Sequence, residues 1–393
     1  MMENLLPSSA VANYLQPEGT ITMRFLLVLS CLVFGSLAVG QEAITPVALR
    51  DQDYYRHSEG SAIELADGRI LLAWSRFAGA AGDDNGKATI VAAESKDGGK
   101  TWSQPKELPV GKASINIMQA AFVPVKDRLM LAFSVRDGGR SVKHAIESKD
   151  GGRTWSERRK LFDAGGPNDR AVRLASGRIL MPSHRVSKQR IGGYEDMEVL
   201  VARSDDEGRT WKLSEVVPHV PHPMERKPVN PRPVKIHEPA IAELADGSLL
   251  MLARSSVGWL YRSISKDGGE TWSRLEPTTI ASLVAPPYLH RCRDGRIALL
   301  WNPIVGEKAK ALAERCQAMN VPLGFQQRSR LAMMTTKDGQ TWDQERVLAE
   351  DGKHGFCYPA VLSRGDGQLL IFCSRTPDII SPCDLVMLGP VTP

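Results

Sequence analysis

The stretch SKDGGKTW occupies residues 95–102, and close copies follow at 148–155, 204–211 and 265–272. A shortened fifth copy, TKDGQTW, occupies residues 336–342. The shared pattern S/T-x-D-x-G-x-T-W predicts a tight turn, because Asp accepts backbone N–H groups, Gly adopts a positive φ and Trp covers the turn. Five copies cannot each be an active site. We therefore interpret this box as a structural unit that marks the repeats of the fold.

The spacing of the boxes indicates a β-propeller. The box aspartates Asp97, Asp150, Asp206, Asp267 and Asp338 lie 53, 56, 61 and 71 residues apart. A period of this length suits a blade of about four short strands joined by turns. The chain has 393 residues, of which 42% are hydrophobic, so it can bury a substantial core. A ring of repeated β units can use this length as one domain.

A second repeat counts six units. Each unit joins a turn to an apolar strand, and the copies are DGRILLAW (67–74), KDRLMLAF (126–133), SGRILMPS (176–183), DGSLLMLA (246–253), DGRIALLW (294–301) and DGQLLIFC (366–373). Each of the first five precedes one box, whereas the sixth has none. A closed ring explains this if AITPVAL (43–49) pairs with DLVMLGP (384–390), which leaves no open sheet edge. We therefore predict an all-β fold, a single six-bladed β-propeller over residues 41–393 that an N-terminal strand closes in the last blade.

The N-terminal segment is typical of an export signal. Arg24 precedes the apolar stretch FLLVLSCLVF (25–34), and small residues follow up to Gly40. The apolar stretch is too short for a membrane span. We predict a signal peptide at residues 23–40, cleavage near Gly40, and export to the periplasm or the extracellular space, with no membrane span in the mature chain. Residues 1–22 are expected to be an unstructured upstream extension. A lipoprotein cysteine at Cys31 is the alternative interpretation.

Charge and cysteine content argue against several classes of function. The formal charge is +5, spread along the chain without a run of Lys or Arg, so nucleic acid is not an expected partner. An anionic ligand is compatible with this charge. Five cysteines remain after the signal peptide, and an odd number leaves at least one thiol unpaired. No C-x-x-C pair occurs, so we predict no metal or redox role for cysteine, and we expect a monomer.

Two insertions interrupt the repeat. Residues 218–235 (PHVPHPMERKPVNPRPVK) contain too many prolines for a regular strand. Residues 306–320 (GEKAKALAERCQAMN) have the composition of a helix. Long connections of this kind in a compact fold often form the walls or lids of functional sites.

The six inner turns give a common register for the ends of the innermost strands. Counting eight residues back and eight forward from each turn gives mostly polar residues, among them Glu59, Asn168, His184, Glu238, Arg254, Asn302 and Tyr358. In a propeller these positions lie at the central channel, so we predict one shared polar cavity. The alternative at any single position is an ordinary polar strand end.

Four residues in or near this set could form a catalytic group that binds a carboxylate. Glu238 beside Tyr358 could take the phenolic proton and generate a nucleophile with little negative charge. Arg254 and Arg328 offer paired donors to a carboxylate, although each could also be a solvated strand-end charge. Arg330 lies two residues after Arg328 on the same side of a strand, so the register leaves both arginines open.

These residues lie in segments that resemble the sialidase (neuraminidase) superfamily, whose Asp-box propellers have six blades. HEPAIAEL (237–244) is similar to the segment of the family's catalytic Glu, here Glu238. MLARSSVGWLYRSISKDGG (251–269) and QRSRLAMMTTKDG (327–339) resemble the strands of its second and third carboxylate-binding arginines, here Arg254 and Arg328. CYPAVLSRGDGQLL (357–370) is similar to the segment of its Tyr nucleophile, here Tyr358, with Pro359 in place of the family's Ser.

The resemblance also implies an acid/base aspartate in the loop before the first box. That loop is AGAAGDDNGKA (78–88), which offers Asp84 first and Asp83 second. The implied activity is a retaining exo-sialidase that removes a terminal acidic sugar from a glycan or glycoconjugate, with a Tyr nucleophile and no metal or cofactor. The residues expected to shape the substrate pocket are Glu59, Asn168, His184 and Asn302.

One element of the family pattern is absent. Sialidases begin the first blade with Phe/Tyr-Arg-Ile-Pro, and the matching stretch here is YRHSEGSAIELADG (55–68). The register places Ser58 or Glu59 at the arginine position, and a glutamate there would repel a substrate carboxylate. Either Arg56, Arg76 or Arg375 supplies the third positive charge, or the ligand is not an ordinary sialic acid. Three alternatives therefore stay open: a propeller glycosidase for another glycan, a non-catalytic glycan-binding propeller, and a purely structural propeller.

Overall fold

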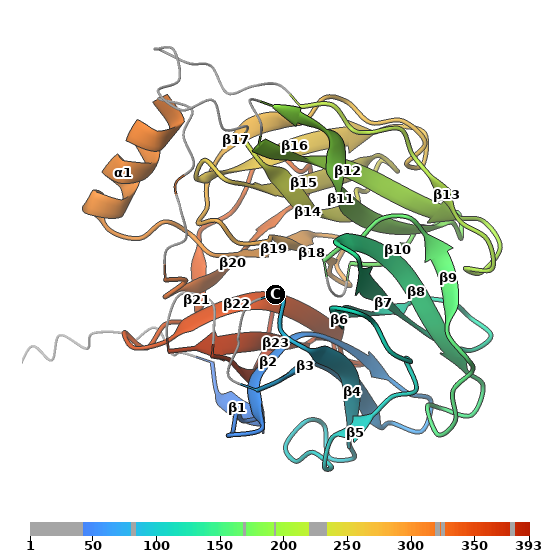
Figure 1. The fold of residues 1–393 in the computed structure, drawn as a ribbon. Helices are drawn as coiled ribbons and strands as arrows, with labels where there is room; N and C mark the ends of the chain where they lie inside the picture. Colours follow the sequence, from blue (N-terminus) through green and yellow to red (C-terminus); the bar gives the residue numbers. More distant parts are fainter. Residues whose placement is uncertain are drawn as a thin grey trace, which may run out of the picture. The chain divides into compact units, whose positions relative to one another are not determined.

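The computed structural model describes residues 42–79, 84–167, 170–191, 194–219, 234–318, 323, 327–377 and 382–393. Within these residues, six antiparallel sheets of four strands each are arranged as the blades of a β-propeller (Figure 1). The prediction of an all-β, six-bladed propeller is confirmed. The predicted signal peptide and upstream extension lie outside the described residues and stay predictions.

The blades follow the order of the chain. Blade 1 contains β2 (Tyr54–Glu64), β3 (Ile70–Ala78), β4 (Ala88–Ser95) and β5 (Lys106–Glu107). Blade 2 contains β6 (Asn116–Val123), β7 (Leu129–Asp137), β8 (Arg140–Ser148) and β9 (Arg159–Phe162). Blade 3 contains β10 (Val172–Arg173), β11 (Ile179–Ile191), β12 (Tyr194–Ser204) and β13 (Lys212–Leu213).

Blade 4 contains β14 (Ile236–Glu243), β15 (Leu249–Ser255), β16 (Trp259–Ser265) and β17 (Glu276–Ala281). Blade 5 contains β18 (Tyr288–Arg291), β19 (Ile297–Trp301), β20 (Leu331–Thr336) and β21 (Arg346–Ala349). Blade 6 contains β22 (Gly355–Ser363), β23 (Leu369–Thr376), β24 (Asp384–Val391) and the N-terminal β1 (Ile44–Ala48).

Strand β1 closes the ring as its sequence predicts. It pairs antiparallel with β24, with Ile44 opposite Leu388 and Thr45 opposite Met387. The innermost strand of blade 6 also contacts that of blade 1, since β22 lies beside β2. Six clusters of buried apolar side chains fill the interfaces between successive blades, including the interface of blade 6 with blade 1.

The boxes form the predicted turns, each between the third and fourth strands of a blade. In the first box, the Asp97 carboxylate accepts hydrogen bonds from the Thr101 backbone N–H (2.9 Å) and hydroxyl (2.6 Å). The Gly99 N–H donates to the Ser95 hydroxyl at 2.8 Å, and the Trp102 indole N–H donates to the Gly99 carbonyl at 3.1 Å. The interpretation of the box as a structural unit therefore agrees with its geometry.

Each box also contacts the blade before it in the ring. One glycine of each box, the second where the box has two, lies against a side chain of that blade: Gly99 against Met387, Gly152 against Leu71, Gly208 against Met130, Gly269 against Leu180 and Gly339 against Leu250. Blade 6 has no box, and the pairing of β1 with β24 completes it instead.

Helix α1 (Glu307–Ala318) lies in the second insertion, where the sequence predicts a helix. Its Ala313 and Cys316 pack with Ile304 and Leu323 in a small apolar cluster. The proline-rich residues 220–233 lie outside the described part of the chain. Where the structure describes the chain, no helix has the length and apolar character needed to cross a membrane. The five described cysteines are all buried free thiols.

Candidate active site

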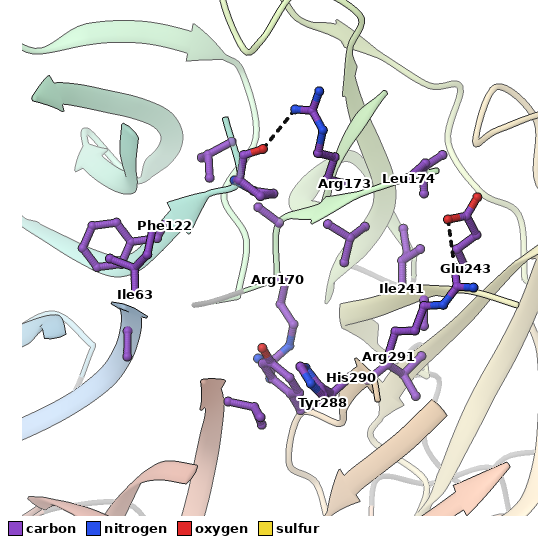
Figure 2. Close-up of a pocket in the computed structure, with 18 residues that line it drawn as sticks. Ile63, Phe122, Arg170, Arg173, Leu174, Ile241, Glu243, Tyr288, His290 and Arg291 are labelled. Atoms are coloured by element: carbon purple, nitrogen blue, oxygen red, sulfur yellow. Dashed lines mark hydrogen bonds and ion pairs between the residues drawn. The ribbon is translucent and has the colours of Figure 1, made fainter. Parts of the chain in front are cut away.

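The innermost strands have two ends that differ in chemistry. At one end, residues from the innermost strands of all six blades line a cavity of about 320 Å³. Its walls are largely apolar, with Ile63, Phe122 and Ile241 around Arg170, whose guanidinium lies 4.3 Å from the centre of the Tyr288 ring (Figure 2). None of the predicted site residues that the structure describes lines this cavity.

The described residues of the predicted site lie towards the other end, where four of the innermost strands have a bulge at the same place. The bulges fall between Ser58 and Ser61, Met118 and Ala121, His237 and Ala240, and Cys357 and Ala360. At each bulge one residue adopts a positive φ: Glu59 (57°), Gln119 (65°), Glu238 (50°) and Tyr358 (54°). Such backbone is costly for residues other than glycine and is concentrated at functional sites, so these four side chains mark a candidate site.

Glu238 is held by an ion pair with Arg254, and both side chains are buried. Burial alone would raise the pKa of Glu238, but the charge of Arg254 lowers it to about 2. The Glu238 backbone N–H donates to Nδ1 of His184 at 3.4 Å. Burial lowers the pKa of His184 to about 4, so this imidazole is neutral and can accept the bond.

Tyr358 lies among the charged groups of this cluster. Burial raises the pKa of its phenol, and the negative charge of Glu238 raises it further, while Arg328 and Arg254 oppose the shift. The guanidinium of Arg328 lies 5.2 Å from the centre of the Tyr358 ring. The phenol is therefore protonated in the free protein and surrounded by both the base and the cations that its ionisation would require.

Arg328 rather than Arg330 belongs to the cluster. Arg328 is buried, and its Nη2 donates to the Val284 carbonyl at 2.8 Å. Its Nη1 is buried without a hydrogen-bond partner in the described structure, which leaves donor capacity for a ligand. Arg330 instead pairs with Glu350 and Glu345, at 2.8 and 3.1 Å.

Arg56 also enters the cluster, although the register places it two or three residues too early. The paired register of β2 and β3 shifts between Tyr54 and Arg56 and again after Ser58, and an alignment without bulges misses both shifts. The buried Arg56 pairs with Asp84 at 2.8 Å, and its Nη2 lies 4.0 Å from the Glu59 carboxylate. Asp83 lies outside the described residues.

The other two arginines considered for the third charge lie elsewhere. Arg76 lies 3.9 Å from the centre of the Tyr54 ring and 3.8 Å from Glu107. Arg375 pairs with Asp384 at 2.9 Å. Among these three candidates, Arg56 alone contacts the acid/base candidate Asp84.

Glu59 and Lys143 form a second, unexpected feature. Burial raises the pKa of Glu59 to about 7; Arg56 opposes the shift, and the charges of Asp84 and Glu238 add to it. Burial lowers the pKa of Lys143 to about 7, against the effect of Glu59, and the Lys143 Nζ has no hydrogen-bond partner in the described structure. The sequence gives no clear signal for a buried lysine here, because the strand that contains Lys143, RSVKHAIES (140–148), is mostly polar.

Asn302, a predicted pocket residue, binds neighbouring backbone instead of the charged cluster. The Asn302 amide donates to the carbonyls of Arg330 (2.7 Å) and Phe356 (2.6 Å), so it connects β19 to neighbouring backbone. A contact of Asn302 with substrate stays a prediction. Asn168 lies outside the described residues. Among the described residues, no group of three or more His, Cys, Asp or Glu side chains is arranged to hold a metal ion.

Comparison with known proteins places the chain in a family. The model of the BNR repeat-like domain matches residues 68–371. A sialidase from Micromonospora viridifaciens is 25% identical over 306 residues, which cover 68% of this chain and 42% of that protein. The chain thus spans less than half the length of this relative.

Solved structures share the fold at low sequence identity. A protein of unknown function from Dyadobacter fermentans superposes with a TM-score of 0.65 at 17% identity, over 89% of this chain and 99% of that one. A Trypanosoma rangeli sialidase in complex with the inhibitor DANA superposes with a TM-score of 0.62 at 14% identity, over 89% of this chain and 58% of that one. At these identities the likeness concerns the fold alone.

Proposed function

Because this chain belongs to the BNR repeat-like family, we propose that it is an exported sialidase-like glycoside hydrolase that removes a terminal acidic sugar from glycoconjugates. The surroundings of Tyr358 support the proposal: its half-buried phenol lies under the influence of the Glu238 carboxylate and of the Arg254 and Arg328 guanidinium groups, and Arg328 lies 5.2 Å from the centre of its ring. This set combines a nucleophile, a base and cations that can bind a carboxylate.

The cations would fix the substrate carboxylate. Arg328 has a free Nη1, and Arg254 and Arg56 each lie in the same cluster, paired with Glu238 and Asp84. Three guanidinium groups from β2, β15 and the segment before β20 could surround one carboxylate, as the family resemblance implies. Arg56 would then take the place of the arginine that the first-blade motif lacks.

Tyr358 would attack the anomeric carbon of the bound sugar. The phenolic oxygen forms the new bond to carbon, its proton passes to Glu238, and the glycosidic bond breaks with its electron pair on the leaving oxygen. Asp84 supplies the proton for that oxygen. Asp84 then removes a proton from water, which cleaves the Tyr–sugar bond with overall retention. A neutral phenol suits this attack because the anomeric carbon bears a carboxylate that would repel a charged nucleophile.

Substrate binding would also activate the base. In the free protein Arg254 holds the pKa of Glu238 at about 2, which makes Glu238 a poor acceptor for a phenolic proton. A substrate carboxylate that binds Arg254 neutralises this charge. The pKa of Glu238 then rises, and proton transfer from Tyr358 becomes more favourable.

A fluorogenic α-sialoside tests this proposal. The wild-type protein is expected to release the fluorophore, and Tyr358→Phe is expected to lower kcat by at least about a thousandfold, because the phenyl ring keeps the shape but lacks the nucleophilic oxygen. Glu64→Gln, at the exposed end of β2, serves as the control. Absence of turnover by the wild type on every sialoside linkage would refute the proposal.

Glu59 favours one alternative activity, a propeller glycosidase for another sugar. Its buried carboxyl lies 4.0 Å from Arg56, where a substrate carboxylate would otherwise gain contact. A sugar with a hydroxyl or amine at that position could bind Glu59 instead. A panel of fluorogenic glycosides distinguishes the two, since this alternative predicts turnover of a glycoside other than a sialoside and loss of that turnover in Glu59→Gln.

A further inference from the structure

A second cavity opens beside the candidate site, between blades 2 and 3. Its volume is about 770 Å³, which is in the range of pockets that hold small ligands. Asp84 and His184 both line it. Because His184 also accepts the backbone N–H of Glu238, the cavity borders the candidate site. We call this cavity the side cleft.

The position of Asp84 decides which part of a substrate could reach the side cleft. In the proposed function, Asp84 protonates the oxygen that leaves with the rest of the glycan. The sugar bonded to that oxygen must therefore extend on the side of Asp84. Since the side chain of Asp84 is 62% exposed and borders the side cleft, the leaving sugar would enter this cleft.

The acidic groups of the side cleft are already neutralised. Asp84 pairs with Arg56 at 2.8 Å, and Asp163 pairs with Lys160 at 2.7 Å. The cleft residue Arg185 pairs with Glu198 at 2.6 Å. Each of these carboxylates therefore already has a cationic partner.

Three further cations of the side cleft have no carboxylate partner in the described structure. Arg136 binds the Asp84 backbone carbonyl and the Asn85 side-chain oxygen, both of which are neutral. Arg140 and Lys188 are exposed and make no ion pair with a described residue. The side cleft therefore has a surplus of positive charge and would attract an anionic group.

The wall of the side cleft also offers apolar surface. The strands β11 and β12 form the longest hairpin among the described residues and supply Val186 and Met197 to the wall. Val186 is 46% exposed, although it is large and hydrophobic. Met118 from β6 lines the same cavity. Apolar surface beside free cations suits a sugar ring that carries a charged substituent.

We infer that the side cleft binds the leaving-group sugar of an acidic glycan through a sulfate or carboxylate on that sugar. The inference rests on the proposed function, because Asp84 defines the leaving side. The shared chemistry is an oxyanion held by Arg140, Lys188 and Arg136. Exposed contacts of this kind are individually weak, so two of them together are expected to change affinity roughly five- to twentyfold.

A binding measurement tests the side cleft without turnover. Isothermal titration of the wild-type protein with lactose, 6-sulfated lactose and a uronic-acid disaccharide compares a neutral sugar with two anionic ones. At least one anionic sugar is expected to bind five- to twentyfold more tightly than lactose. The double variant Arg140→Ala/Lys188→Ala is expected to abolish this preference, whereas Lys337→Ala, which removes an exposed lysine of the fifth box, should keep it.

Turnover gives the second arm of the test. We compare two sialosides that differ only in a sulfate on the leaving sugar. The enzyme should have the higher kcat/KM on the sulfated one, and 0.5 M NaCl should reduce this difference because salt screens the charges. Equal affinities for all three sugars, or a preference that survives in the double variant, would overturn the inference. Failure to hydrolyse any sialoside while the binding preference holds would refute the proposed function but not the anion-binding cleft.

Discussion

Glu59, Gln119, Glu238 and Tyr358 owe their positions to a backbone conformation that costs free energy. Each has a φ between 50° and 65° at a bulge of an innermost strand. Left-handed backbone costs a residue with a Cβ roughly 1–2 kcal/mol. Four such residues at one end of the ring therefore represent a sizeable cost, which the packing of the blades must offset. The same bulges bring two carboxylates, Glu59 and Glu238, into one cluster with widely different pKa values of about 7 and 2.

The raised pKa of Glu59 predicts an alkaline limit for activity. The charged groups around it are Arg56, Asp84, Glu238 and Lys143. Below about pH 7 Glu59 is neutral, and above that pH its negative charge opposes an anionic substrate. We expect kcat/KM of the wild type to fall as the pH rises through about 7, and Glu59→Gln to remove this fall. Measurement of kcat/KM between pH 5 and 9 checks the expectation, with Glu64→Gln as control; an identical alkaline limb in Glu59→Gln would contradict it.

At the residue scale, the sequence predicts part of the site and misses the rest for a physical reason. The positions of Glu238, Arg254 and Tyr358 follow from counting along strands, and the structure brings these three side chains together. A fixed count from the turn does not select Arg56, because two register shifts in β2 change which residue reaches the channel. The count does not select Lys143 either, because it covers the first two strands of each blade and Lys143 lies in the third strand of blade 2.

The boxes act as contacts between blades as well as turns. In all five boxes a glycine lies against a side chain of the preceding blade. In the second box, a Cβ added to Gly152 would lie 2.9 Å from the Leu71 side chain of blade 1. Glycine is therefore needed here for two reasons: the backbone has a φ of +82°, and a side chain would overlap the neighbouring blade. The local pattern predicts the turn, but only the folded ring shows which blade the turn contacts.

Two glycine variants separate these purposes. Gly152→Ala introduces both left-handed strain and overlap with Leu71, whereas Gly247→Ala, at a φ of +81° with open space around it, introduces strain alone. We expect Gly247→Ala to lower the free energy of unfolding by about 1 kcal/mol and Gly152→Ala by about 2–4 kcal/mol. Urea unfolding measures both. Equal losses would show that the box glycine does not contribute to the contact between blades.

The whole ring depends on a strand from the opposite end of the chain. Strand β1 supplies the outermost strand of blade 6, and its partner β24 would otherwise present an open edge. The missing sixth box predicts this closure from sequence, so the architecture is the best predicted level of the molecule. The long insertion at residues 218–235 has no comparable pattern, and most of it lies outside the described residues.

Removal of β1 tests the closure. A chain that begins at Arg50 lacks β1, and a matched chain that begins at Gln41 retains it. We expect the shorter chain to unfold at a temperature lower by about 10 °C or more, because it loses the pairing with β24 and the burial of its apolar residues. The shorter chain should also elute as larger species in size-exclusion chromatography, since its exposed edge can pair with other chains. Equal melting temperatures for the two chains would rule out closure by β1.

Capture of the bond between Tyr358 and the sugar would identify the proposed nucleophile. A 3-fluorosialosyl fluoride carries a good leaving group, while its ring fluorine slows hydrolysis of the intermediate. Mass spectrometry of the digested protein should find one sugar adduct per chain, on the peptide that contains Tyr358, and Tyr358→Phe should form none. Sialoside turnover accompanied by an adduct on Glu59 or Glu238, or by no adduct at all, would show that Tyr358 is not the nucleophile.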